Sequence, residues 1–118
     1  MPISDRRKWK VNRSPDEILK IVVNKLAQKK AKLIEATSRR IEATMGSGLK
    51  TRVIGGLLVS KKTLPVKITL LMNEVAGETE IDATIEDNLG FGIKTGMVGR
   101  YREYMQSLFD ELAKALQE

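Results

Sequence analysis

The chain has 118 residues, which is the length of one domain, and 42% of them are hydrophobic, which is enough for a core of its own. It contains neither Cys nor His, so disulfides, thiolate chemistry, most zinc sites and Ser-His-Asp triads are excluded. Any acid–base chemistry would rest on Asp, Glu, Lys or Tyr. We find no catalytic motif, no set of metal ligands and no cofactor motif, and a non-catalytic protein is therefore expected before an enzyme.

The formal net charge of +6 is unevenly distributed. Residues 1–67 hold 17 Lys or Arg against 5 Asp or Glu, a net charge of +12, whereas residues 68–118 hold 4 against 10, a net charge of −6. Such asymmetry indicates either a surface for nucleic acid or acidic partners, or two halves that neutralise each other after folding. No apolar run is long enough to span a membrane, and the first residues lack the apolar segment of a secretory signal, so a cytoplasmic location is expected.

The first elements in chain order are a strand and a helix. Residues 7–11 alternate charged and apolar side chains, which predicts a short strand. Ser14 is then followed by Pro15 and by Glu17, a capping box with proline at the first helical position. The helix is predicted to run from Pro15 to about Lys29, and its apolar stripe consists of Ile18, Leu19, Val22, Val23 and Leu26.

Five further segments have β patterns: residues 31–37, 39–45, 51–59, 66–74 and 79–87. The last of these has the clearest alternation, with apolar side chains on one face and charged or Thr side chains on the other. Because most of the connections are short, neighbouring strands are expected to pair antiparallel.

A second helix is predicted over about residues 97–117 from apolar positions at helical spacing. The order is therefore β-α-β-β-β-β-β-α, within a single domain of residues 1–118. We predict an α+β fold in which one face of an antiparallel sheet of about five strands is covered by the N-terminal helix and the long C-terminal helix.

This order resembles the helix-grip folds of the START-like and polyketide-cyclase-like superfamily. The matching features are an opening strand, "SPDEIL" at the start of the first helix, the antiparallel meander, and "GFGIKTG" before the long last helix. The resemblance spans nearly the whole chain and is architectural, since no specific motif carries it. The chain is short for that superfamily and lacks a second small helix after the first. A TATA-binding-protein-like half-domain has a similar order of elements.

The helix-grip resemblance, together with a sheet face rich in Met and aliphatic residues, implies a non-catalytic module that binds an apolar or lipid-like small molecule between the sheet and the last helix. The alternative is that the same side chains simply fill the core of a small domain. The candidate ligand-binding residues are Trp9, Leu57, Leu70, Met72, Ile85, Phe91, Tyr101, Met105 and Leu108.

A second class of function is a basic interaction module for nucleic acid or an acidic partner. Gathering of the basic side chains on one surface would favour this function, and dispersal would disfavour it. Stacking on single strands is not expected, because the chain has only five aromatic residues and most lie on or beside the last helix's apolar stripe. The candidate residues are Arg6, Arg7, Lys8, Lys10, Lys29, Lys30, Arg39, Arg40, Lys61 and Lys62.

The glycine-rich segment 87–100, "DNLGFGIKTGMVGR", invites a phosphate-binding interpretation. A P-loop requires glycine where this chain has Asn88 and Ile93, and the dinucleotide-binding pattern fails because Gly96 comes one position late. No strand follows the helix to complete a dinucleotide site. We therefore interpret the segment as a turn that brings the last helix close to the sheet, or as the gate of a pocket.

Two other segments allow alternative interpretations. Residues 51–65 are nearly continuously apolar around a Gly55-Gly56 pair, which is typical of a bent central strand, of the mouth of an apolar pocket, or of a contact in a homodimer. The carboxylates Glu80, Asp82 and Glu86 share one strand face. They indicate either a metal or glycosidase site, or a solvated face paired with lysines such as Lys67.

Overall fold

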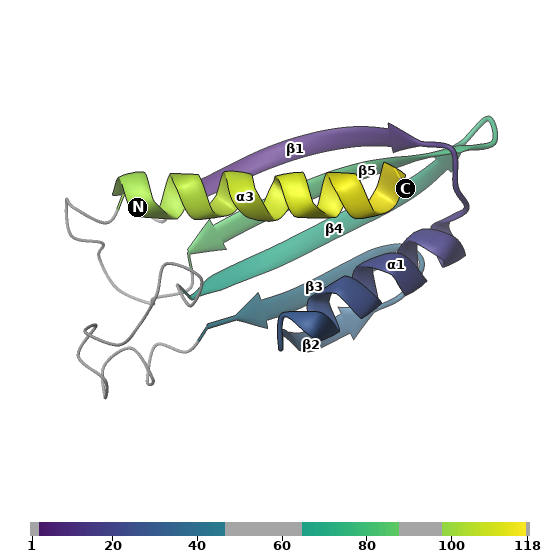
Figure 1. Cartoon of the computed structure of the whole chain (residues 1–118). Coiled ribbons are helices and arrows are strands. Elements are labelled where there is room, and N and C mark those ends of the chain that lie inside the picture. Colours follow the sequence, from purple (N-terminus) through teal and green to yellow (C-terminus); the bar gives the residue numbers. More distant parts are fainter. Residues whose placement is uncertain (1–2, 47–64, 88–97, 118) are drawn as a thin grey trace.

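The computed structural model describes residues 3–46, 65–87 and 98–117. These residues form the predicted α+β fold, a five-stranded antiparallel sheet with a shorter and a longer helix on one face (Figure 1). The predicted strand over residues 51–59 lies outside the described residues. The elements are β1 (Ser4–Val11), α1 (Pro15–Gln28), β2 (Lys32–Ala36), β3 (Arg40–Met45), β4 (Val66–Val75), β5 (Glu78–Asp87) and α3 (Val98–Gln117).

The strands lie in the order β1-β5-β4-β3-β2, and all neighbours pair antiparallel. β1 begins earlier than predicted, at Ser4 rather than at residue 7. The alternation of apolar and polar residues does not predict the first part of this strand. Asp5 and Arg7 lie opposite the inward-facing Ile85 and Ala83, at positions where an apolar side chain would be expected. These two charged side chains find polar partners on α3, as described below.

The α1 helix begins with the predicted capping box. The Ser14 hydroxyl accepts a hydrogen bond from the backbone N–H of Glu17 at 3.2 Å, and the Glu17 carboxylate faces the backbone N–H of Ser14 at 3.5 Å. Together these contacts satisfy two of the free N–H groups of the first turn. The helix buries one side of its predicted stripe, at Ile18, Val22 and Leu26.

A two-residue turn connects β4 to β5. Val75 pairs with Glu78, and the residues between them, Ala76 and Gly77, have φ angles of 54° and 84°. Positive φ at both central positions is the geometry of a type I′ turn, whose twist matches that of the paired strands. The turn fixes the register of the two longest strands of the sheet.

The core lies between the sheet and the helices. Figure 1 shows α3 extending along β1 and β5, and α1 lying toward β3 and β2 on the same face. Every second residue of β3, of β4 from Val66 to Met72 and of β5 from Thr79 to Ile85 turns a buried side chain to the helices, and the intervening residues face outward. The predicted division into an apolar and a polar sheet face is therefore confirmed for these strands.

One end of the sheet is where the two undescribed internal segments join the described elements. Met45, Val66 and Asp87 lie in one row across β3, β4 and β5. Segment 47–64 connects the first two of these strands, and segment 88–97 leads from the third to α3. The segments that the sequence predicts to form a gate or a pocket mouth lie outside the described residues, so both interpretations stay predictions.

Candidate functional site

Seven of the nine predicted ligand-binding residues are described, and the structure brings them together. Leu57 and Phe91 lie outside the described residues. Trp9 is partly buried against the core, and its ring meets that of Phe109 edge to face, with centroids 6.0 Å apart. The other six are buried in one cluster contributed by β4, β5 and α3: Leu70, Met72, Ile85, Tyr101, Met105 and Leu108.

The N-terminal half of α3 carries the only predicted lining residue with a hydroxyl group. Tyr101 is buried, and its hydroxyl donates a hydrogen bond to the backbone carbonyl of Pro65 at 3.1 Å. Burial, with a smaller contribution from the charge of Asp87, raises the pKa of Tyr101 above its ordinary value of 10.0. The phenol is therefore neutral near pH 7 and acts as a hydrogen-bond donor.

Tyr104, one turn further along α3, is partly buried. Burial, and to a lesser extent the charge of Glu111, raises the pKa of Tyr104 to about 12. Neither tyrosine has the lowered pKa that a general base or nucleophile would need near neutral pH. Both phenols are therefore protonated near neutral pH and can donate hydrogen bonds.

A polar network fastens β1 to the middle of α3. The Arg7 guanidinium donates to the Asp110 carboxylate at 2.9 Å and also to the side-chain oxygen of Gln106. Gln106 in turn donates from its side-chain nitrogen to Asp5. The guanidinium also lies over the ring of Phe109. The two charged positions of the inner face of β1 are thus satisfied by α3.

The C-terminal part of α3 is tied to the region around α1. Lys29 forms an ion pair with Glu111, and the Arg13 guanidinium donates to the backbone carbonyl of Leu116 at 2.9 Å. A cation at this position satisfies a free carbonyl of the last turn and complements the helix dipole. The backbone carbonyl of Arg13 accepts a hydrogen bond from the buried Thr79 hydroxyl at 2.6 Å. α3 is therefore held at both ends, by different parts of the fold.

The predicted basic residues are distributed over several elements, and four of the eight described ones lie on the outward sheet face. Arg7 contacts α3, three others lie on the outward face of β1, two follow α1, and two lie at the start of β3, while Lys61 and Lys62 fall outside the described residues. Among the described residues, four ion pairs join the basic first half of the chain to the acidic second half. This arrangement does not favour a nucleic-acid surface. The pairs are Arg6–Asp82, Arg7–Asp110, Lys10–Glu80 and Lys29–Glu111.

The carboxylate row of β5 is paired with the neighbouring edge strand. The Arg6 guanidinium donates two hydrogen bonds to Asp82, and Lys10 lies 3.8 Å from Glu80. The hydrogen bond from Arg6 lowers the pKa of Asp82 below its ordinary value. No group of three or more carboxylates within the described ranges is arranged to hold a metal ion. The row therefore has the character of a paired, solvated sheet face.

Lys67, the predicted partner of the β5 carboxylates, forms an ion pair with a residue of β3 instead. It lies opposite Glu86 in the ladder, but its ammonium group is 3.2 Å from the Glu42 carboxylate on β3. Arg40 also donates to Glu42, at 3.1 Å. The hydrogen bonds from Lys67 and Arg40 lower the pKa of Glu42. The outward sheet face thus carries balanced charges on both sides of β4.

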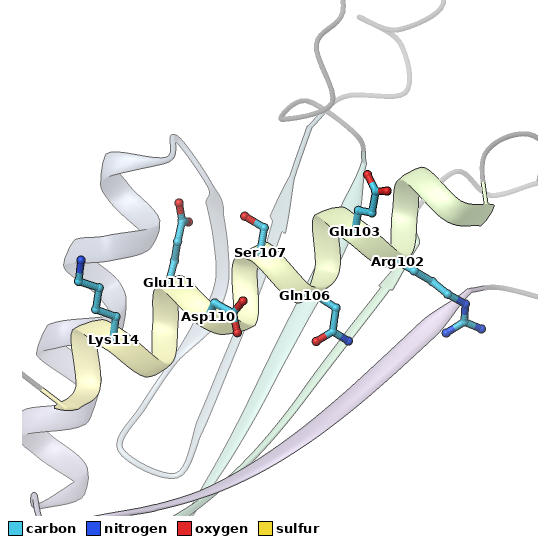
Figure 2. A pocket seen from close by; sticks show the side chains of 7 residues that line it. All are labelled: Arg102, Glu103, Gln106, Ser107, Asp110, Glu111 and Lys114. Atoms are coloured by element: carbon cyan, nitrogen blue, oxygen red, sulfur yellow. The ribbon is translucent and has the colours of Figure 1, made fainter.

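Two surface hollows were not anticipated from the sequence, and neither lies between α3 and the sheet. The first, of about 620 Å³, runs along α3 (Figure 2), where Arg102 and Gln106 point toward β1 and Glu103 and Glu111 point to the other side. Its remaining lining residues are Ser107, Asp110 and Lys114. Side chains of both charges line it, and the helical periodicity of residues 102–114 would have indicated only a solvated face.

The second hollow, of about 560 Å³, lies where β1, β5 and β4 meet. Leu71 stands among charged side chains there and is 44% exposed. In the sequence, only the alternation of inward and outward positions along β4 distinguishes the exposed Leu71 from the buried Leu70. The lining residues are Lys8, Trp9, Lys10, Leu71, Met72, Asn73, Glu80, Ile81 and Asp82.

No protein-family model matches the chain, and no curated protein matches it either. Several solved structures share its fold. The crystal structure of Ara h 8.0201 matches with a TM-score of 0.59 at 10% sequence identity, covering 98% of this chain and 95% of that one. The crystal structure of TTHA0849 from Thermus thermophilus matches with a TM-score of 0.51 at 11% identity, covering 97% of this chain and 94% of that one.

The solution structure of the Aha1 dimer from Colwellia psychrerythraea matches with a TM-score of 0.50 at 11% identity, covering 93% of this chain and 96% of that one. At such low identities these similarities concern the fold alone. They support the helix-grip-like arrangement that the order of elements predicts. Among the described residues, no helix is both long and apolar enough to cross a membrane.

Proposed function

We propose that the protein is a non-catalytic binding module that holds an apolar or lipid-like small molecule between the inner sheet face and α3. The observation that carries this proposal is the cluster of buried apolar side chains that the inner sheet face and α3 share. Leu70 and Ile85 contribute to it from the sheet, and Tyr101, Met105 and Leu108 contribute from the helix. A fold that presents one apolar sheet face to a long helix and a shorter one (Figure 1) is suited to enclosing such a ligand.

The chemistry of this surface favours a ligand with few polar groups. Met72 and Met105 are unbranched and adapt readily to irregular apolar shapes. The Tyr101 hydroxyl, the one hydroxyl among the predicted lining residues, already donates to the Pro65 carbonyl. Recognition would therefore rest on shape and burial rather than on a set of fixed hydrogen bonds.

Leu57 and Phe91 belong to the proposed lining on the basis of the sequence alone, because both lie outside the described residues.

The first experiment asks whether the purified protein carries a small molecule. Native mass spectrometry would be followed by solvent extraction and by titration with fatty acids of graded chain length, with the fluorescence of Trp9 as the readout. We expect an extracted apolar compound or saturable binding that strengthens with chain length, by about 0.8 kcal/mol for each buried methylene group. Absence of both results would contradict the proposed function.

A matched pair of variants locates the site. Met105→Phe adds a ring beneath α3, and Leu71→Phe adds a comparable ring on the outward face of the same sheet, where the leucine is exposed. We expect the first variant to weaken fatty-acid binding at least about tenfold, because added volume competes with the ligand. The second should bind as the wild type does. Thermal unfolding of both variants checks that they are folded, and equal binding by both would place the ligand elsewhere.

A further inference from the structure

The edge strand β2 is more exposed than any other strand of the described sheet. β2 pairs with β3 on one side only and stands at the end of the strand order. All five of its residues are exposed, and Leu33 and Ile34 expose 39% and 54% of their surface. Unpaired backbone groups together with exposed aliphatic side chains make such an edge a template for another strand.

The opposite edge is protected from pairing with itself. β1 carries Arg6, Arg7, Lys8 and Lys10, so two copies of this strand brought side by side would place like charges together. On β2, by contrast, the exposed side chains include one cation and one anion, Lys32 and Glu35. The two edges of the sheet therefore differ in whether a second copy of the chain would be repelled.

We propose that β2 pairs antiparallel with β2 of a second copy of this chain, forming a two-fold symmetric dimer. The order of residues 32–35 is positive, apolar, apolar, negative, and the β-bulge between Leu33 and Glu35 puts Lys32 and Glu35 on the same outward face, so this order is complementary to itself when the strand is reversed. Lys32 of one copy then faces Glu35 of the other, twice by symmetry, with Leu33 and Ile34 of both copies between the two ion pairs.

The local geometry of β2 makes this association weak and reversible. A β-bulge between Leu33 and Glu35 shifts the register of the β2–β3 ladder, which limits the length over which the free edge can pair. Glu35 also lies 3.4 Å from Arg40 of its own chain, so its carboxylate is shared between two cations in the dimer. The dimer should therefore respond strongly to protein concentration and to salt.

Charge reversal tests the proposed pairing directly. Lys32→Glu places two acids opposite each other, and Glu35→Lys places two lysines opposite each other. By sedimentation equilibrium over about 5 to 500 μM, we expect the wild type to form a dimer. The dissociation constant of the dimer should be at least about tenfold higher for each variant, because like charges directly opposite each other are destabilising in a sheet. An equimolar mixture of the two variants should form a heterodimer, since each then supplies the charges that the other lacks.

Further variants exclude indirect effects. The double variant Lys32→Glu/Glu35→Lys restores complementarity and should dimerise like the wild type. Glu74→Lys makes the same change of charge at an exposed position near the far end of β4 and should leave the dimer unaffected. A wild type that stays monomeric at all concentrations overturns the proposal, as does a dimer that both single variants leave unchanged. Because the pairing does not involve the apolar surface beneath α3, either result is independent of the ligand experiment.

Discussion

The guanidinium carbon of Arg7 lies 4.9 Å from the centroid of the Phe109 ring, which joins the edge strand β1 to the middle of α3. The same guanidinium is bound to Asp110, and its side chain is 29% exposed. From the sequence, Arg7 was predicted to contact nucleic acid, because it lies among several basic residues near the N-terminus. In the structure it holds the long helix on the sheet, whereas its neighbours Arg6 and Lys8 point outward.

The first prediction concerns this contact. Arg7→Met should lower the free energy of unfolding by about 1 to 2 kcal/mol, because it removes a cation–π contact and a partly exposed ion pair, each of which contributes about 0.5 to 1 kcal/mol. Lys8→Met removes the same charge from the exposed face of the same strand and should change the free energy by less than about 0.5 kcal/mol. Equal losses in urea unfolding would show that the Arg7 contacts contribute nothing specific.

The second prediction concerns the β4–β5 turn. Ala76 has a φ of 54°, a conformation that costs a residue with a Cβ atom about 1 kcal/mol, and Asn adopts it more readily. Ala76→Asn should therefore raise the free energy of unfolding by about 0.5 to 1 kcal/mol. Gly77→Ala should lower it by about 1 kcal/mol through backbone strain alone, since a Cβ atom at Gly77 would meet no other group within 4 Å. Melting temperatures that move in any other pattern would contradict the assigned turn.

The third prediction concerns acid unfolding. The pKa of Glu42 and the pKa of Asp82 are both lowered in the folded state, from ordinary values of 4.5 and 3.8. The stability that these carboxylates contribute is therefore present above those ordinary values and is lost as the pH falls through the folded-state pKa values. Glu42→Gln and Asp82→Asn should each make the free energy of unfolding depend less steeply on pH between about pH 5 and pH 3.

Removing the partner of Glu42 provides an independent check. Lys67→Met takes away the hydrogen bond that contributes most to the lowered pKa of Glu42. The acid slope should again become shallower, and adding Glu42→Gln to this variant should change the slope further by less than it does in the wild type. Additive effects of the two substitutions would show that they act independently. Urea unfolding at closely spaced pH values measures the wild type, the two single variants and the double variant.

The fold could be predicted because local signals agree with one another along most of the chain. The capping box at Ser14 and the alternation of residues 79–87 each indicate one structure, and that structure is observed. The prediction failed at the start of β1, where Asp5 and Arg7 face inward. No local pattern reveals that their partners Gln106 and Asp110 lie on a helix at the other end of the chain.

The candidate site was predictable only in part. Alternation places Leu70 and Ile85 on the inward face, and helical spacing does the same for Tyr101 and Met105, so their meeting follows from the fold. The exposure of the β2 side chains, by contrast, could not be predicted from the alternation of residues. Residues 32–36 have an ordinary β pattern, and only the order of strands in the sheet shows that this strand stands at an edge.

The fourth prediction concerns the buried bond between Tyr101 and Pro65. Tyr101→Phe keeps the ring but leaves a carbonyl without its donor, and it should lower the free energy of unfolding by about 1 to 2 kcal/mol near pH 7. The pKa of Tyr101 is raised in the folded state, so the contribution of this residue is complete below the ordinary value of 10.0 and is lost as the pH rises beyond it. The difference between the wild type and the variant should therefore shrink above about pH 10 in urea unfolding. A variant as stable as the wild type at pH 7, or a difference that grows in alkali, would show that the hydroxyl has no stabilising role at this end of the sheet.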